Sequence, residues 1–356
     1  MQINIRFSSL RLILILFLCG TTVVLLENYN LSHDQSLPGS CLGILIGVGL
    51  AVVLFLPSVI LKIKYNYDIS DVLNAGSKPV RIAGATVFSA YLIYTAEYFL
   101  LKYTDMFTKK YYTDTSEWFV AFLLLSVCAY AAYRGANTIT RFALFLFGFA
   151  LVVYALIFGG AVGEIKPEGF DFGISMEGLL QDSLFFATAS FGAVIFSCTS
   201  GYTERFKLRH ILITAGCLAA FFAAVVCFER LALGSYGSQQ EYQMFLLSKI
   251  QRLGDIKGVE ALYMAVATVS VFCLISLSLC GINRVSGESK VLKSTLIFSA
   301  IIFVLSLCAA SFISVREILS SVLFFDIFTV LVILFALALI VFFALGKGKS
   351  NDCKTA

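Results

Sequence analysis

Ten apolar runs, each about long enough to cross a bilayer, occupy most of this chain. Inside a bilayer no water can satisfy the backbone, so continuous runs of this length form helices, whose hydrogen bonds are internal. A hydrophobic content of 59% and a charged content of 13% exclude a water-soluble globule. We therefore predict an all-α membrane protein with ten transmembrane helices in one domain, 1–356. The predicted spans are 10–26, 42–61, 82–101, 118–133, 142–162, 183–201, 211–228, 261–283, 294–315 and 318–345.

The charged residues predict how these spans are oriented. With the N-terminus placed inside, roughly two thirds of the 26 lysines and arginines fall in inner segments, as the positive-inside rule expects. Most acidic residues then fall outside. We therefore expect both termini in the cytoplasm, and the net charge of +4 reflects topology, not nucleic-acid binding. Arg6 and Arg11 precede the first run as in a signal peptide, but no small-residue cleavage site follows, which favours a retained helix.

Metal, redox and catalytic chemistry have little support in the sequence. The ten cysteines form no Cys-x-x-Cys pair, and only two histidines are present. No nucleophile triad or phosphate-binding loop is recognisable. We expect no cofactor, no metal and no enzymatic activity.

Small and hydroxyl residues occur in the middle of two runs. The first run contains Gly20, Thr21 and Thr22, and the sixth contains Ser190 and Gly192. Such residues loosen a helix at mid-membrane, and the freed backbone groups can hold a polar ligand. The two runs are five apart, which is the offset of two matching broken helices in an inverted five-plus-five repeat. Tight helix packing through small residues is the alternative explanation.

Two acidic residues lie inside apolar runs, Glu97 in the third and Asp326 in the tenth. A carboxylate in hydrocarbon is costly, so we expect each to be protonated, to face the bundle interior or to line a wet cavity. Tyr94 precedes Glu97 by three positions and is a candidate hydrogen-bond partner. Thr268 is one of several hydroxyl residues in the eighth run, although such hydroxyls often bond back to their own helix.

A motif follows the fourth run, Tyr130-x-x-x-Arg134-Gly135, with Arg141 six residues further on. It resembles a signature of the spore germination permeases, the B subunits of endospore germinant receptors. Weaker similarities are Gly20-Thr21-Thr22, Glu177-Gly178-Leu179-Leu180 before the sixth run and Val259-Glu260-Ala261-Leu262 at the start of the eighth.

The resemblance implies both a fold and a function. The family is similar to the amino acid–polyamine–cation transporter superfamily, whose LeuT-type inverted five-plus-five repeat has a pocket between spans 1, 3, 6 and 8. It implies a nutrient-sensing subunit that binds a small molecule, commonly an amino acid. Its partners would be an A subunit and a lipoprotein C subunit, in the inner membrane of the spore.

The chain departs from the family pattern at two places. Ala193 and Val194 follow Gly192, where polar residues are frequent, and the first half of the eighth run lacks tryptophan. These departures leave the identity of the ligand open.

A binding hypothesis follows for a zwitterionic ligand. Its carboxylate would lie near freed N–H groups around Gly20, Thr21 and Thr22, because helix N-termini attract anions. Its amino group would face hydroxyls of the sixth span, such as that of Ser190, or Glu97.

The remaining residues allow several interpretations. Arg134 and Arg141 contact a partner subunit or lipid head groups, or serve only to set topology. A proton- or cation-coupled amino-acid transporter is an alternative function, with Glu97 or Asp326 as the coupling carboxyl. A structural scaffold with a vestigial pocket is a third possibility.

Overall fold

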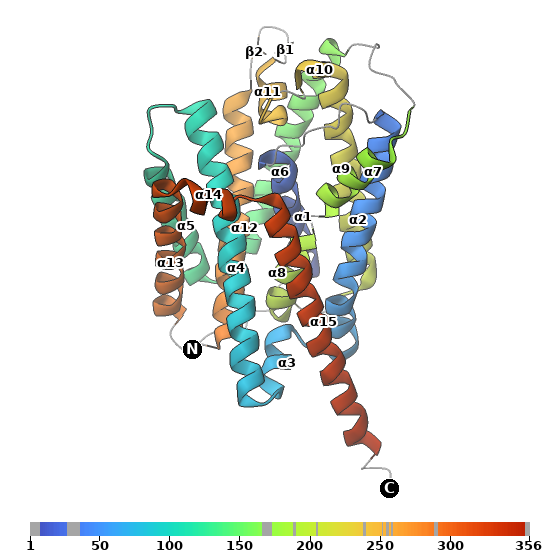
Figure 1. Ribbon diagram of the computed structural model, residues 1–356, viewed down its shortest axis with the longest axis vertical. Helices are drawn as coiled ribbons and strands as arrows, with labels where there is room; N and C mark the ends of the chain where they lie inside the picture. Colours follow the sequence, from blue (N-terminus) through green and yellow to red (C-terminus); the bar gives the residue numbers. More distant parts are fainter. Residues whose placement is uncertain are drawn as a thin grey trace.

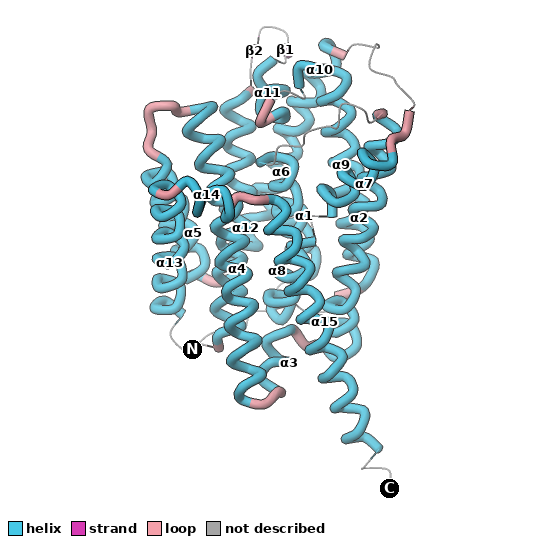
Figure 2. Tube along the Cα trace, in the orientation of Figure 1, coloured by secondary structure: helices cyan, strands magenta, loops and turns pink. Residues whose placement is uncertain are grey.

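The structure is a computed structural model that describes residues 8–26, 36–165, 173–187, 190–203, 206–237, 240–250, 252–253, 256–257, 259–287 and 291–352. These residues are almost entirely helical (Figure 1), and short loops join the helices (Figure 2). Two two-residue strands, β1 (Arg252–Leu253) and β2 (Ile256–Lys257), pair antiparallel with Leu253 opposite Ile256. The predicted all-α class is confirmed.

Nine long helices and six shorter ones are found in the described chain. The long ones are α1 (Ser9–Leu26), α2 (Leu37–Ile60), α4 (Lys78–Met106), α5 (Glu117–Arg134), α6 (Ala136–Ala161), α9 (Leu208–Phe228), α12 (Glu260–Ser286), α13 (Val291–Ser311) and α15 (Val322–Asp352). The shorter ones are α3 (Ile69–Ala75), α7 (Met176–Ala187), α8 (Phe191–Thr199), α10 (Gly234–Gly237), α11 (Gln243–Ile250) and α14 (Ile313–Leu319). Wider π-type turns form η1 (Leu61–Tyr65), η2 (Phe107–Tyr111) and η7 (Glu229–Leu233), and 3-10 turns form η3 (Val162–Glu164) and η6 (Ser200–Tyr202).

Nine helical segments of the described chain are long and apolar enough to cross a membrane. α4 occupies the place of the third predicted span but is not among them. It has 29 residues, which is sufficient length, yet its lysines, acids and hydroxyl residues make it less apolar than the others. The expected count of ten spans is therefore not confirmed by apolarity.

Two helices form the centre of the bundle. Among the nine apolar spans, α1 and α12 have the largest buried share, 78% of the residues in their most apolar stretch, against 22% for α13 and α15. α1 packs against α6, α9 and α12, and α12 also packs along α4. Because α1 is apolar on all sides, it can be surrounded by protein.

The sixth predicted span is divided into two helices. α7 ends at Ala187, and α8 begins at Phe191, just before Gly192. α8 lies inside the bundle, where all nine of its residues are buried, whereas α7 lies at the edge against α2 (Figure 1). The Ser58 hydroxyl of α2 and the Ser197 hydroxyl of α8 form a hydrogen bond of 2.6 Å, which fixes α8 in place.

α2 and α7 approach each other closely at two glycines. A Cβ atom added at Gly43 would lie 2.5 Å from Cβ of Asp182, and one added at Gly47 would lie 2.6 Å from the backbone oxygen of Ser183. The spacing Gly43-x-x-x-Gly47 is typical of membrane helices in close contact. The contact fixes the first half of the divided span.

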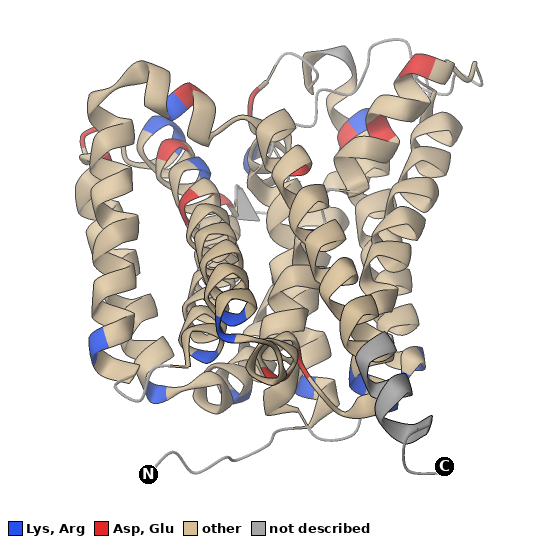
Figure 3. Cartoon of the chain, turned by 60° about the horizontal axis from the view of Figure 1, so that its bottom comes forward, with Lys and Arg blue, Asp and Glu red and all other residues tan. Residues whose placement is uncertain are grey.

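The charged residues differ between the two ends of the bundle. Lys and Arg gather at the end where α1 begins and α15 ends, and Asp and Glu are more frequent at the opposite end (Figure 3). We refer to these as the basic end and the acidic end. The acidic end carries α10 and α11, and the basic end carries α3 (Figure 1).

Candidate ligand-binding site

Gly20 of α1 and Gly192 of α8 line the same small cavity, although 172 positions separate them in the chain. Side chains of α2 and α9, including Phe55 and Leu218, complete its walls. The cavity measures about 40 Å³, far below the roughly 300–1,000 Å³ of typical ligand sites. It is therefore too small for an amino acid in this conformation.

Both glycines permit close side-chain packing. A Cβ atom added at Gly20 would lie 2.9 Å from Cδ2 of Leu218, and one added at Gly192 would lie 3.2 Å from Cζ of Phe55. Such short distances agree with the alternative explanation of these small residues, in which they allow neighbouring helices to pack tightly.

The expected break in the first span is wrong for the described residues. α1 is a continuous helix from Ser9 to Leu26, so Gly20 lies in regular helix. Thr21 donates its hydroxyl hydrogen to the backbone oxygen of Leu18 at 2.8 Å, and Thr22 does the same to Cys19. Because the α1 backbone remains helical there, no freed N–H groups are present around Gly20 to hold a carboxylate.

In the sixth span, the predicted Ser190 lies at the start of α8. This residue precedes the first residue of α8 and is 3% exposed.

Three hydroxyl groups meet between α1, α6 and α12. The Tyr154 hydroxyl lies beside those of Thr21 and Ser270. No hydrogen bond of normal geometry joins Tyr154 Oη or Ser270 Oγ to any described residue, and both side chains are buried. An unsatisfied buried hydroxyl costs about 1–3 kcal/mol, so this trio is suited to bind a polar group. The trio contains the predicted Thr21, while Tyr154 was missed although a tyrosine at mid-span was visible in the sequence.

Glu97 is fully buried, and neither of its carboxyl oxygens forms a hydrogen bond with a described residue. The expected hydrogen bond from Tyr94 is therefore absent. The Tyr94 ring packs instead against Phe324, Phe325 and Phe328 of α15. Side chains three positions apart on a helix point in directions that differ by about 60°, so Tyr94 and Glu97 need not meet. The aromatic contacts with α15 decide where Tyr94 points.

Glu97 also faces away from α8. Glu97 follows Ala90 by seven positions and Ile93 by four, so the three residues share one face of α4. Ala90 and Ile93 line a cavity together with Phe298 of α13. Phe99, which contacts Phe191 of α8 at 5.1 Å between ring centres, lies on the opposite face. A ligand next to Gly192 is therefore not expected to reach Glu97.

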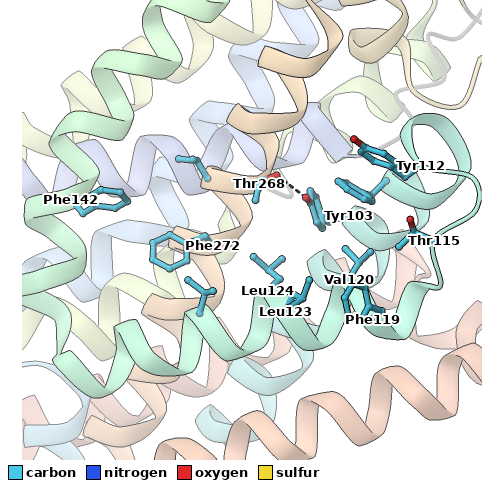
Figure 4. A pocket seen from close by; sticks show the side chains of 13 residues that line it. Tyr103, Tyr112, Thr115, Phe119, Val120, Leu123, Leu124, Phe142, Thr268 and Phe272 are labelled. Atoms are coloured by element: carbon cyan, nitrogen blue, oxygen red, sulfur yellow. Dashed lines mark hydrogen bonds between the residues drawn. The ribbon is translucent and has the colours of Figure 1, made fainter.

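Thr268 lies in a different and larger cavity, of about 540 Å³ (Figure 4). Its hydroxyl donates to the Met264 backbone oxygen at 2.7 Å and is 2.7 Å from the Tyr103 hydroxyl. Apart from a few hydroxyl groups, the surrounding side chains are aromatic or aliphatic. Such a lining does not suit the two charges of a zwitterion.

Asp326 lies one helical turn after the start of α15 and is half-buried. Its charge acts on the phenol of Tyr91 of α4, which forms a 2.8 Å hydrogen bond with Thr329 of α15.

Arg134 and Arg141 flank the junction of α5 and α6 and are exposed. Gly135 between them has φ of +93°, a conformation that side chains with a Cβ rarely adopt. This backbone requirement explains the glycine of the Arg-Gly motif.

A polar network at the basic end was missed by the sequence analysis. Arg284 of α12 donates to the buried carboxylate of Asp68 at 2.5 Å and stacks over the Tyr202 ring at 5.0 Å. Ser70 donates to the Arg284 backbone oxygen at 3.0 Å. Burial raises the pKa of Asp68, and the Arg284 guanidinium opposes that rise. The network joins the end of span 8 to α3 and to the end of span 6.

Comparisons with known proteins agree on a membrane transporter fold. The sequence model of a family described as spore germination protein matches residues 4–311. No curated protein matches the chain. The solved structure of a Na⁺-coupled sialic acid symporter, in a substrate-bound outward-open state, aligns with a TM-score of 0.66 at 13% identity and covers 96% of this chain and 79% of that chain. This likeness concerns the fold, and it confirms the predicted LeuT-type architecture.

Proposed function

Because the chain belongs to the spore germination permease family, we propose that it is the nutrient-sensing membrane subunit of a germinant receptor. A multi-pass membrane protein with a germinant-sensing or transport role is the part that family and fold establish. The proposal adds that a small molecule, such as an amino acid, binds at mid-membrane between α1, α6, α8 and α12.

One observation carries this proposal, the hydroxyl trio of Thr21, Tyr154 and Ser270. Tyr154 and Ser270 are buried without hydrogen bonds among the described residues, and their side chains come from two different helices that surround α1. A bound ligand with amino or carboxyl groups would supply the missing partners.

Binding would require the helices to move. None of the three hydroxyl residues lines the cavity of about 40 Å³ next to Gly20 and Gly192, so an amino acid would reach the trio only if α1 moves relative to α6 or α12. A ligand that binds one conformation better than another shifts the population between them. Such a shift is what a receptor subunit needs in order to signal to its partners.

The same family membership supports a proposal for the partners and the location. We propose that A and lipoprotein C subunits associate with this chain in the cell membrane or in the inner spore membrane. The basic end would be cytoplasmic with both termini on that side, by the positive-inside rule. Arg134 and Arg141 would then contact a partner subunit or lipid head groups from the cytoplasm.

A proton- or cation-coupled amino-acid transporter is the second candidate function. The fold of the Na⁺-coupled symporter favours it, as does the fully buried carboxyl of Glu97, which has no hydrogen-bond partner in the part of the chain that the structure describes. Asp326, next to Tyr91, would be a second candidate for coupling.

Ligand binding to the purified full-length chain tests the primary proposal. Each common amino acid, radiolabelled, is offered in turn, and binding is measured for the wild type, Tyr154→Phe and Ser270→Ala. Loss of one hydrogen bond to the ligand predicts about fivefold to tenfold weaker binding. Tyr236→Phe, an exposed tyrosine, is the matched control and should bind normally.

Two results would contradict the proposal. Binding that is unchanged in both Tyr154→Phe and Ser270→Ala would place the ligand elsewhere. Accumulation of the bound amino acid inside proteoliposomes, abolished by an ionophore, would favour the transporter instead.

A further inference from the structure

A second cavity, separate from the hydroxyl trio, lies between α4, α5, α6 and α12. We call it the lateral groove, and Figure 4 shows the side chains around it. Its volume of about 540 Å³ is within the range of roughly 300–1,000 Å³ typical of ligand sites. Its lining side chains come from Tyr103, Phe107, Tyr112, Thr115, Phe119, Val120, Leu123, Leu124, Val127, Phe142, Thr268, Val269 and Phe272.

The groove opens sideways, toward the membrane. Phe119, Leu123 and Val127 on one face of α5 are 43%, 49% and 57% exposed, and Phe142 of α6 is 52% exposed. Both α5 and α6 are membrane-spanning helices, so the medium at this opening is hydrocarbon. Any occupant must therefore enter from the bilayer or be part of it.

The groove has the length and direction expected for an acyl chain. Phe119 and Val127 are eight residues apart on α5, which corresponds to about 12 Å along the helix. One end of the groove, which we call its upper end, lies at the acidic end of the bundle, where the chain passes from α4 to α5. There Tyr112 is 55% exposed and stacks on Phe107 with ring centres 5.5 Å apart, and Trp118 is 51% exposed. Exposed tyrosine and tryptophan of this kind mark the lipid head-group level.

Lys110 stands in the chain between Phe107 and Tyr112, two residues that line this end of the groove. Lys110 of η2 is exposed and forms no ion pair within the described residues. Its neighbour Lys109 pairs with Asp105 at 3.0 Å, and Arg316 holds both Asp105 and Glu117. Lys109 and Asp114 are the other exposed charges between residues 107 and 116. Lys110 is thus the positive charge that remains available to a phosphate.

We infer that the lateral groove binds one glycerophospholipid, with an acyl chain along α5 and its phosphate next to Lys110. The observations that support this occupant are the opening toward hydrocarbon, the interfacial aromatic residues and the unpaired lysine. The bound chain would contact the place where Tyr103 of α4 and Thr268 of α12 form their hydrogen bond. The lipid would therefore stabilise the packing of α4 on α12, whatever small molecule the hydroxyl trio binds.

Native mass spectrometry of the full-length chain tests this site. The protein is delipidated in mild detergent and titrated with dioleoyl phosphatidylglycerol. Leu123 is an exposed residue that lines the groove, and in Leu123→Trp the larger side chain would fill it. This variant should lose the tightest-bound phospholipid. Leu331→Trp, at an equally exposed leucine of α15 outside the groove, should retain it.

The phosphate and the acyl chain are tested separately. Lys110→Gln should bind the phospholipid about fivefold more weakly, because a lysine near the membrane surface contributes about that much. Dioleoylglycerol, which lacks the phosphate, should bind equally to the wild type and to Lys110→Gln. Lys293→Gln, an exposed lysine of α13, is the control for charge.

Three outcomes would overturn the inference. The first is that the wild-type chain retains no phospholipid in the titration. The second is that Leu123→Trp retains as much phospholipid as the wild type. The third is that a protein helix, and not a lipid, is found to occupy the groove. The ligand-binding experiment on Tyr154 and Ser270 is independent of all three, so either proposal can fail alone.

Discussion

Arg284 of α12 and Asp68, 216 positions earlier in the chain, form a hydrogen-bonded ion pair of 2.5 Å at the basic end. The Asp68 side chain has no exposed surface, whereas that of Arg284 is 23% exposed. Asp68 also accepts the N–H of Asp71 at 2.9 Å and so caps α3. A single carboxylate therefore joins the start of a short helix to the end of a central one.

Asp68→Asn should destabilise the protein strongly. The substitution keeps a side-chain oxygen for the cap but removes the negative charge that compensates Arg284, and breaking a buried pair in this way costs about 3–5 kcal/mol. Unfolding in detergent, titrated with a denaturing surfactant and followed by circular dichroism, measures the change. Asp71→Asn is the control, because Asp71 is 38% exposed and 3.7 Å from Arg284, and it should cost less than about 1 kcal/mol. Equal effects of the two substitutions would contradict the role assigned to the pair.

The helical spans could be predicted from the sequence, whereas this ion pair could not. A membrane span is recognised from the mean hydropathy of about 20 consecutive residues, which the sequence gives directly. The pairing of Asp68 with Arg284 depends on how helices far apart in the chain pack together, and both residues looked like ordinary charges of the basic side. That Gly20 and Gly192 lie close together could be predicted from the sequence, because an inverted five-plus-five repeat pairs each span with the span five places later.

Other errors have local physical causes. A glycine and two threonines in span 1 suggested a break, but Thr21 and Thr22 bond to their own helix and Leu218 packs over Gly20, so α1 stays regular. The partner assigned to Glu97 was wrong because α15 supplies three phenylalanines that attract the Tyr94 ring. Neither packing arrangement is encoded in the residues of one helix.

Gly47→Ala should separate α2 from α7. The added methyl group would lie 2.6 Å from the Ser183 backbone oxygen and 3.0 Å from the Ala187 backbone nitrogen, and backbone atoms cannot move aside as a flexible side chain can. Overpacking of this kind costs about 1–3 kcal/mol in unfolding free energy. The same surfactant titration measures it.

Gly49→Ala provides the matched control on the same helix. A Cβ atom there meets nothing within 4 Å, so the substitution should stabilise the protein by up to about 1 kcal/mol through helix propensity. If the two substitutions change stability in the same direction, the close contact between α2 and α7 is not what holds the divided span.

Glu97→Leu should stabilise the protein. Both carboxyl oxygens are buried without a hydrogen bond to a described residue, so their removal relieves a desolvation penalty of about 1–3 kcal/mol. The exposed Glu241→Leu should change stability by less than about 0.5 kcal/mol. Destabilisation by Glu97→Leu would instead show that the carboxyl has a partner in the folded protein.

The same variant separates the two candidate functions. A sensing subunit whose ligand lies at the hydroxyl trio should keep its ligand affinity in Glu97→Leu, because the Glu97 carboxyl forms no hydrogen bond with the trio or with any other described residue. A transporter that uses Glu97 for coupling should lose concentrative uptake into proteoliposomes.

Gly135→Ala should destabilise the junction that presents Arg134 and Arg141. The φ of +93° at this position is strained for any residue with a Cβ atom, and such strain costs about 1–3 kcal/mol. No atom lies within 4 Å of the added Cβ, so the cost comes from the backbone alone. Gly148→Ala, inside α6 and equally free of contacts, should be neutral or stabilising and is the control. Surfactant-titrated unfolding of both variants decides the matter, and a Gly135→Ala protein as stable as the wild type would mean that the Arg-Gly motif is not a backbone requirement.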